Sequence, residues 1–388
     1  MRFGVYIQVP FCQTKCAYCN FHTGVVSSAR YEPYAEAVCR EVREYTTVYG
    51  TAGLALSEGF HQGVVDTVYL GGGTPSLLDP EHLRRMLGVI RSAFTSDLVE
   101  VTLEADPETI EEEKARAWTR SGINRVSLGV QSFSDAELKA AGRMHRRDDI
   151  HGAVPLLRAA GIANLSFDLI AGLPHQTSES WHHSLDELLA FSPEHVSIYL
   201  LELDEGSRLG REVLRGGARY SVGALPTDDE MAEFYDIACR ELASAGYHHY
   251  EISNWAKPGF EARHNLKYWR REPYLGFGAG AHSFSGTERW ANVHDPAAYV
   301  AAIETGSSPI EQREAVSREQ ALEEELFLGL RQLDGIDVAQ LEQVYDVPLS
   351  ARFDALAGAG LVEREGTTVR LAPTRLSISN EVFVELLR

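Results

Sequence analysis

Short apolar segments alternate with amphipathic ones through the first half of the chain. Apolar residues occupy every second position of residues 3–9, a period that predicts a strand with one buried face. Similar short segments predict five more strands, at residues 65–70, 98–103, 124–128, 164–170 and 195–200. Helical periodicity between them predicts helices at residues 31–49, 80–94, 109–121, 150–160 and 179–190. Six strands that alternate with helices predict an α/β fold with a parallel sheet and right-handed crossovers.

The pattern changes in the second half. A Gly- and Arg-rich loop at 204–227 leads to a predicted helix at 228–245 and then to an aromatic stretch at 247–290. After a Gly-Ser-Ser-Pro linker, the sequence predicts a C-terminal winged-helix-like α+β domain, with helices at 318–332, 337–345 and 349–359 and a hairpin of 361–365 with 368–372. These changes divide the chain into three predicted domains, 1–205, 206–305 and 306–388.

Composition narrows the class of protein. The chain has 388 residues, of which 44% are hydrophobic and 24% charged, as in ordinary globular proteins. It has neither a signal-peptide pattern nor an apolar run of the ~18 residues that a membrane-spanning helix needs, which predicts a cytoplasmic protein. The formal net charge of −20 argues against a nucleic-acid partner. Residues 306–388 contain 8 Arg, no Lys and 15 Asp or Glu, so this domain also lacks the cationic surface that DNA binding needs.

Three cysteines lie directly after the first predicted strand. Cys12, Cys16 and Cys19 form a C-x3-C-x2-C run, and a short loop of this kind can bring three thiolates to one place. Three thiolates are one fewer than a fully ligated [4Fe–4S] cluster uses, so one iron would stay open for another ligand. The alternatives are three reduced cysteines or a zinc site completed by a histidine such as His22. The two other cysteines, at 39 and 239, stand alone in helical patterns and are expected to be buried.

Unusual residues follow several of the other predicted strands. Strand two ends in the glycines 71–73, strand three in Glu104, strand four in Gln131, and strand five contains Asp168. The carboxyl ends of parallel strands meet at one edge of the sheet, so we expect these residues to face the cysteine loop. Arg143, in a loop after strand four, is expected at the same edge.

Five motifs at these positions resemble the radical S-adenosylmethionine (SAM) superfamily, and specifically its coproporphyrinogen-dehydrogenase-like branch. They are CxxxCxYC at 12–19, YLGGGTP at 69–75, EADP at 104–107, SLGVQSF at 127–133 and DLIAGLP at 168–174. The resemblance implies a partial (β/α)6 TIM-like barrel in which the three cysteines hold a [4Fe–4S] cluster and SAM chelates the open iron. The positions that match the family's SAM contacts are Tyr6, Gly72, Thr74, Glu104, Gln131, Arg143 and Asp168.

Two features separate the branches of this group. Phe21 stands where the dehydrogenase pattern has an additional cysteine, and the first strand begins near Arg2 without the dehydrogenase's leading segment. Residues 264–269 read HNLKYW, and an H-N-x-x-Y-W motif resembles that of the haem chaperone family HemW. The resemblance implies a protein that binds haem and passes it to acceptor haemoproteins. The alternative is an oxygen-independent coproporphyrinogen III dehydrogenase, which decarboxylates propionate side chains oxidatively, so enzymatic activity stays open.

The HNLKYW segment also supplies a candidate haem ligand. His264 could bind the iron through a neutral imidazole, while Tyr268 and Trp269 could contact the macrocycle. Alternatively, His264 could form hydrogen bonds within a packed aromatic region. Rival ligands are His282 and the pair at 248–249. The resemblance leaves open whether the acceptors lie at the membrane, whether the chain associates with it peripherally, and whether a cluster-dependent dimer forms.

Overall fold

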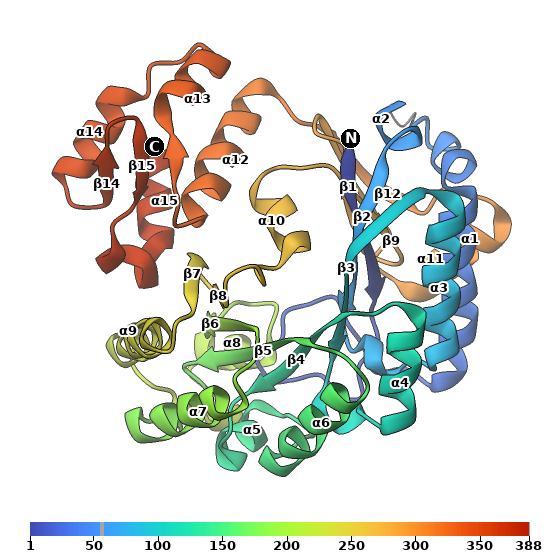
Figure 1. Cartoon of the computed structure of the whole chain (residues 1–388), viewed down its shortest axis with the longest axis horizontal. Helices are drawn as coiled ribbons and strands as arrows, with labels where there is room; N and C mark the ends of the chain where they lie inside the picture. The colour runs from blue at the N-terminus through green and yellow to red at the C-terminus, as the bar shows by residue number, and fades with distance from the viewer. Residues whose placement is uncertain (55–57, 388) are drawn as a thin grey trace.

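One twelve-stranded sheet forms the body of the molecule, in a computed structural model that describes residues 1–54 and 58–387 (Figure 1). Its centre consists of six parallel strands in chain order, paired from β1 to β6. Their bounds are Arg2–Val9, Val64–Gly72, Thr95–Ala105, Arg125–Gln131, Asn164–Ala171 and His195–Leu200. The curved sheet is therefore the predicted partial barrel, and all six predicted strands form.

Helices cover the outer face of this sheet (Figure 1). The main ones are α1 (Tyr31–Gly50), α3 (Pro80–Ala93), α4 (Glu112–Ser121), α6 (Arg147–Ala159) and α7 (Ser178–Phe191). The alternation in β1 explains which face they cover, because Phe3, Val5, Ile7 and Val9 are all 0% exposed in the main core. The residues between them, such as Tyr6 and Gln8, belong to the opposite face of the strand. Two short helices, α2 (Glu58–His61) and α5 (Asp135–Ala141), were not predicted.

The second half of the chain extends the same sheet at both edges. β7 (His248–Glu251) and β8 (Asn254–Ala256) join the β6 edge. The β1 edge continues through β9 (Tyr274–Phe277), β10 (His282–Phe284), β11 (Glu288–Asn292) and β12 (Ile310–Ala315). β9 runs parallel to β1, so a seventh parallel strand lies within the aromatic stretch that the sequence analysis did not divide. Four further helices belong to this part: α8 (Arg208–Leu214), α9 (Asp228–Ser244), α10 (Arg263–Trp269) and α11 (Pro296–Thr305).

The C-terminal part forms a small α+β unit beside the barrel (Figure 1). Its helices are α12 (Arg318–Arg331), α13 (Val338–Tyr345), α14 (Ser350–Gly358) and α15 (Ser379–Leu387). The predicted hairpin is β14 (Val362–Glu365) with β15 (Thr368–Leu371), and the short β13 (Ile336–Asp337) adds a third strand. Two ion pairs join α12 to the large sheet and its loops, from Arg331 Nε to Glu251 at 2.8 Å and from Arg271 Nε to Glu324 at 2.8 Å.

Among the helices described within residues 1–54 and 58–387, none is both long and apolar enough to cross a bilayer.

Candidate functional site

A cavity of about 530 Å³ opens at the carboxyl ends of the parallel strands and continues into the barrel. Residues from all six parallel strands or the loops that follow them line it, together with part of the C-terminal unit. Nine of the residues predicted from the sequence to hold the cluster or SAM line this one cavity: Cys12, Cys16, Cys19, Gly72, Thr74, Glu104, Gln131, Arg143 and Asp168. The sequence-based expectation that these strand ends face the cysteine loop is therefore met by the geometry.

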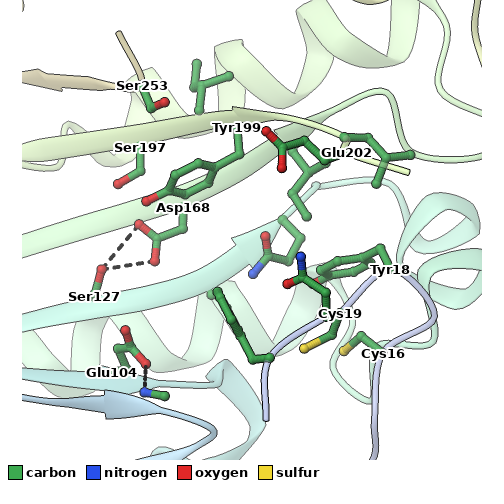
Figure 2. A pocket seen from close by; sticks show the side chains of 18 of the residues that line it. Cys16, Tyr18, Cys19, Glu104, Ser127, Asp168, Ser197, Tyr199, Glu202 and Ser253 are labelled. Carbon is green, nitrogen blue, oxygen red and sulfur yellow. Dashed lines mark hydrogen bonds between the residues drawn. The ribbon is translucent and has the colours of Figure 1, made fainter. Parts of the chain in front are cut away.

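The loop with the three cysteines is held against the end of the sheet by backbone hydrogen bonds. The N–H of Cys12 donates to the Gly24 carbonyl at 3.1 Å, and the N–H of Thr74 donates to the Phe11 carbonyl at 2.7 Å. Gly73 permits this approach, because a Cβ there would lie 2.6 Å from the Phe11 carbonyl oxygen. In Figure 2, Cys16 and Cys19 lie together at one side of the pocket.

The protein environment of the cysteines affects the protonation of their thiols. Burial raises the pKa of the Cys12 and Cys19 thiols, so these groups are protonated until a metal favours the thiolate. The Arg143 guanidinium donates a hydrogen bond to Cys16 Sγ at 3.6 Å. Burial also raises the pKa of the two remaining cysteines, to about 11 for Cys39 and about 12 for Cys239, and neither lines the cavity.

Glu104 lies at the end of β3 inside the cavity. Its carboxylate accepts hydrogen bonds from the Gly72 N–H at 2.8 Å and the Tyr69 hydroxyl at 2.9 Å (Figure 2). Burial, with a smaller contribution from the neighbouring Asp168 and Asp106, raises its pKa to about 7. A buried carboxylate of this kind is poised to accept a hydrogen bond from a cationic or amino group.

Asp168 lies deeper in the barrel, on β5. The Ser127 hydroxyl donates to its carboxylate, at 2.9 Å to Oδ2 and 3.2 Å to Oδ1 (Figure 2). Ser166 donates to Oδ1 at 3.3 Å. Burial raises the pKa of Asp168, although hydrogen bonds from Ser197 and Ser127 oppose that shift. The side chain is thereby fixed as an acceptor, which suits hydroxyl groups such as those of a ribose.

Arg143 is anchored rather than free. Its guanidinium forms an ion pair with Asp106 and donates to the Gly129 carbonyl at 2.9 Å, while Thr74 donates to Asp106 at 3.0 Å. Its Nε has no hydrogen-bond partner although it is buried. Gln131, nearby at the end of β4, has a φ of +63°, a strained conformation for a residue with a side chain. An orphaned buried donor and a strained residue at one point indicate a ligand-binding site.

Tyr6 and His264 lie away from this lining. Tyr6 stacks on Tyr69 with ring centroids 6.0 Å apart, and its hydroxyl donates to Gln8 at 2.7 Å. His264, on α10, is 0% exposed, with Nδ1 2.9 Å from the Thr67 hydroxyl and Nε2 2.8 Å from the Tyr268 hydroxyl. Burial lowers the pKa of His264 to about 3. In this conformation neither ring nitrogen is open to an iron, so the predicted ligation by His264 would require one of these two hydrogen bonds to break.

The sequence analysis missed several residues that line the cavity. Ser197 and Tyr199 alternate on β6, and the period of two within an apolar segment was the signal that could have identified them. Arg125, at the start of β4, is 2% exposed and its buried Nε has no hydrogen-bond partner. It lies at the start of the strand, two residues before the SLGVQSF motif and at the opposite end from the predicted site residues, and gave no sequence signal.

The residues present fit an iron–sulfur cluster and SAM. The three thiols are the only cysteines that line the cavity within the described parts of the chain. The unpartnered Nε of Arg143 suits a carboxylate, Glu104 suits an amino group, and Asp168 suits hydroxyls. Together these groups match the polar groups of an amino-acid nucleoside such as SAM.

Comparison with known proteins agrees with this geometry. The model of the Radical SAM superfamily matches residues 6–188, and that of the HemN C-terminal domain matches residues 316–374. The haem chaperone HemW of Bacillus subtilis is 34% identical over 386 residues, covering 98% of both chains. The chain belongs to the HemW family. Another HemW, from Synechocystis, is 38% identical over 89% of this chain and 81% of its own. As a radical SAM protein, the chain has the [4Fe–4S] cluster and SAM as its cofactors.

A solved structure supports the fold. HemN of Escherichia coli, described as a coproporphyrinogen III oxidase and a radical SAM enzyme, superposes with a TM-score of 0.80 over 99% of this chain and 89% of its own. The two are 20% identical, so this likeness establishes the architecture of barrel and C-terminal domain and nothing about the reaction.

Proposed function

We propose that this HemW-family protein is a haem chaperone, which binds haem and delivers it to acceptor haemoproteins. The single observation that carries the proposal is the full-length similarity to haem chaperones named HemW, at 34% identity over 98% of the chain. Under this proposal haem is the cargo, and the cluster and SAM are resident cofactors.

The cysteine loop supports the chaperone over the dehydrogenase. The position at which the dehydrogenase pattern has a further cysteine is Phe21, and this side chain is 64% exposed beside the cluster loop. A large exposed aromatic ring has no role in ligating a cluster, but it offers a flat apolar contact to a porphyrin or to a partner protein.

The cofactor site has its own residues under this proposal. Cys12, Cys16 and Cys19 would hold the cluster, and the side chains of Glu104 and Arg143 would bind the amino and carboxylate groups of SAM. Asp168 would bind the ribose of SAM. Gly72, at the end of β2, and Thr74, just after it, would let the backbone approach SAM closely. When bound, the cluster and SAM supply an open iron site and a source of a 5′-deoxyadenosyl radical. Tyr6 supports Tyr69, the donor to Glu104, through ring stacking.

The proposal places the carrier in the cytosol, where acceptors are reached in solution or at the membrane surface. Any peripheral membrane contact or cluster-dependent dimer would then serve haem delivery rather than catalysis.

One anaerobic preparation, assayed in two ways, tests the proposal. Reconstituted protein should bind haem stoichiometrically, measured by titration of the Soret band, and should release no CO2 from coproporphyrinogen III in the presence of SAM and a reductant. Conversion to protoporphyrinogen IX at enzymatic rates, without stable haem binding, would replace the chaperone with the dehydrogenase.

A further inference from the structure

Three histidines gather beside the cluster loop and take no part in the site described above. His22 follows the three cysteines, His282 begins β10, and His294 lies just after β11. The rings of His22 and His294 are 4.1 Å apart, centroid to centroid, with their planes tilted by 33°. His282 is close enough to both of the others to have its pKa affected by them. We call these three residues the histidine cluster.

Sheet topology explains why residues so far apart in sequence meet. β9 runs parallel to β1, so its carboxyl end lies at the same edge as the cysteine loop. β10 is antiparallel to β9 and begins at that edge with His282, and β11, antiparallel to β10, returns to it before His294. The N–H of Gly280 donates to the Val293 carbonyl at 2.9 Å, which holds these two loops together.

The ring nitrogens of the histidine cluster are free. Among the described residues none of the three histidines has a hydrogen bond or ion pair through its ring, and the Nδ1 of His294 is buried without a partner. Most other histidines of the chain have such partners, as His195 does with Ser166 at 2.8 Å and Tyr250 at 2.7 Å. Unpartnered imidazoles are the groups that can bind a metal.

The surroundings fit haem better than a bare ion. No three His, Cys, Asp or Glu side chains in the described parts of the chain are placed to share one metal ion, whereas haem iron needs only one or two axial imidazoles. Phe21 and Val25, on either side of His22 in the sequence, are 64% and 60% exposed and offer apolar contact. Lys15 donates to the Phe21 carbonyl at 3.1 Å and supplies a cation next to His22 for a haem propionate.

The protonation state also suits an iron ligand. Partial burial lowers the pKa of His22 and of His282, and in both cases the neighbouring His294 lowers it further. Both imidazoles are therefore neutral at physiological pH and have a lone pair available.

We infer that the histidine cluster of His22, His282 and His294 supplies the axial ligand of the haem that this protein carries, with Phe21 and Val25 against the macrocycle. The inference rests on the haem-carrying function proposed above. It places the cargo beside the cluster loop, next to the cofactor cavity that Lys15 and Phe21 also line, and away from buried His264.

The test compares two triple variants of the full chain with its cluster reconstituted. One replaces His22, His282 and His294 with Ala, and the control replaces the exposed His151, His182 and His183 with Ala. Haemin is titrated into each, and the absorption and resonance Raman spectra report affinity and axial ligation. Cluster absorbance and far-UV circular dichroism check that each variant is folded.

We expect the histidine-cluster variant to bind haemin at least tenfold more weakly and to lose the imidazole-ligated spectrum, while the control behaves as the parent. Haem bound to the parent should also protect the three histidines from diethyl pyrocarbonate, a readout that needs no variant. Parent-like affinity and spectrum in the histidine-cluster variant would overturn the inference and leave the chaperone proposal standing. Failure of the parent itself to bind haemin would overturn both.

Discussion

Single residues at the carboxyl ends of the strands define the cofactor site. Arg143 connects the cysteine loop with the part of the site that we propose binds SAM. Its guanidinium contacts the Cys16 sulfur, pairs with Asp106 and keeps a buried Nε free. One side chain can therefore act on a cluster thiolate and on a SAM carboxylate together. Sequence motifs located this arginine, but they could not indicate that Asp106 orients it, because that contact joins loops 37 residues apart.

The first prediction concerns Arg143. We expect Arg143→Ala to weaken SAM binding by about 1.5–3 kcal/mol, the net value of hydrogen bonds to charged groups. Isothermal titration of SAM into the reconstituted protein measures this. Arg91→Ala is the matched control, because its Nη2 donates to the Ser121 carbonyl at 2.7 Å outside the cavity. Equal SAM affinity in the Arg143 variant and the control would place the SAM carboxylate elsewhere.

The second prediction is a pH dependence at Glu104. Burial raises the pKa of this carboxyl to about 7, so it is protonated below that pH in the free protein and becomes a full acceptor above it. Affinity for the amino group of SAM should therefore rise as the pH increases through 7. Glu104→Gln should bind SAM more weakly and lose this component of the pH profile. The same pH profile in the variant as in the parent would show that Glu104 is not the titrating group.

The third prediction concerns the cysteines. Replacing Cys12, Cys16 and Cys19 with Ala should reduce the iron and sulfide content to about zero after anaerobic reconstitution, since thiolates are the cluster's ligands. Double replacement of Cys39 and Cys239, which lie outside the cavity, should leave the content unchanged. Iron and sulfide retained in the triple variant but lost in the double variant would reverse the assignment.

At the scale of elements, one buried carboxylate joins α1 to the late strands of the sheet and to α11. Glu41, 0% exposed on α1, accepts from the Tyr299 hydroxyl at 2.6 Å, Asn292 Nδ2 at 2.8 Å, the Gly278 N–H at 2.9 Å and the Tyr49 hydroxyl at 3.2 Å. These partners come from α11, β11, the loop after β9, and α1 itself. The network therefore holds the edge of the sheet that carries His282 and His294.

The fourth prediction follows from the pKa of Glu41, which burial raises from 4.5 to about 7. The folded protein binds this proton more tightly than the unfolded chain, so the free energy of unfolding should fall as the pH rises from about 4.5 through 7. Glu41→Ala should make this slope smaller but not abolish it, because burial also raises the pKa of Glu104 and Glu108 to about 7. It should also destabilise the protein by roughly 2–4 kcal/mol at pH 7, because buried donors lose their acceptor. Urea unfolding at several pH values measures both effects, and a slope in the variant equal to that of the parent would contradict the assignment.

The elements themselves were predictable to different degrees. We could predict β1–β6 from the apolar period of two in residues 3–9 and from the regular alternation of strand and helix patterns up to residue 200. Each of these strands pairs with the next strand along the chain, so the local pattern was sufficient. β9 and β10 were not distinguished within the aromatic stretch, and β11 and β12 were not predicted, since the pairing of these strands with β1 and with one another depends on contacts between distant segments. The histidine cluster was missed for the same reason, although His282 had been considered as a haem ligand and His22 as a zinc ligand.

At the scale of the whole molecule, a radical SAM barrel and a HemN-type C-terminal domain are combined in a protein whose relatives are named as haem chaperones. The architecture shared with HemN extends over 99% of this chain and 89% of HemN at 20% identity, so the proposed difference in function does not come from the shared fold. Phe21 and the histidine cluster lie at the rim of the barrel, where such a difference would be expressed.

The most direct test of the chaperone function is transfer of haem from the reconstituted protein to an acceptor. Haem-loaded protein is mixed anaerobically with an apo-haemoprotein, and the Soret bands of donor and acceptor are followed over time. A chaperone should yield holo-acceptor in proportion to the haem it carried, without consumption of a porphyrin substrate. Haem that stays bound to the donor, or an acceptor that loads no faster than with free haem at the same free concentration, would contradict the account.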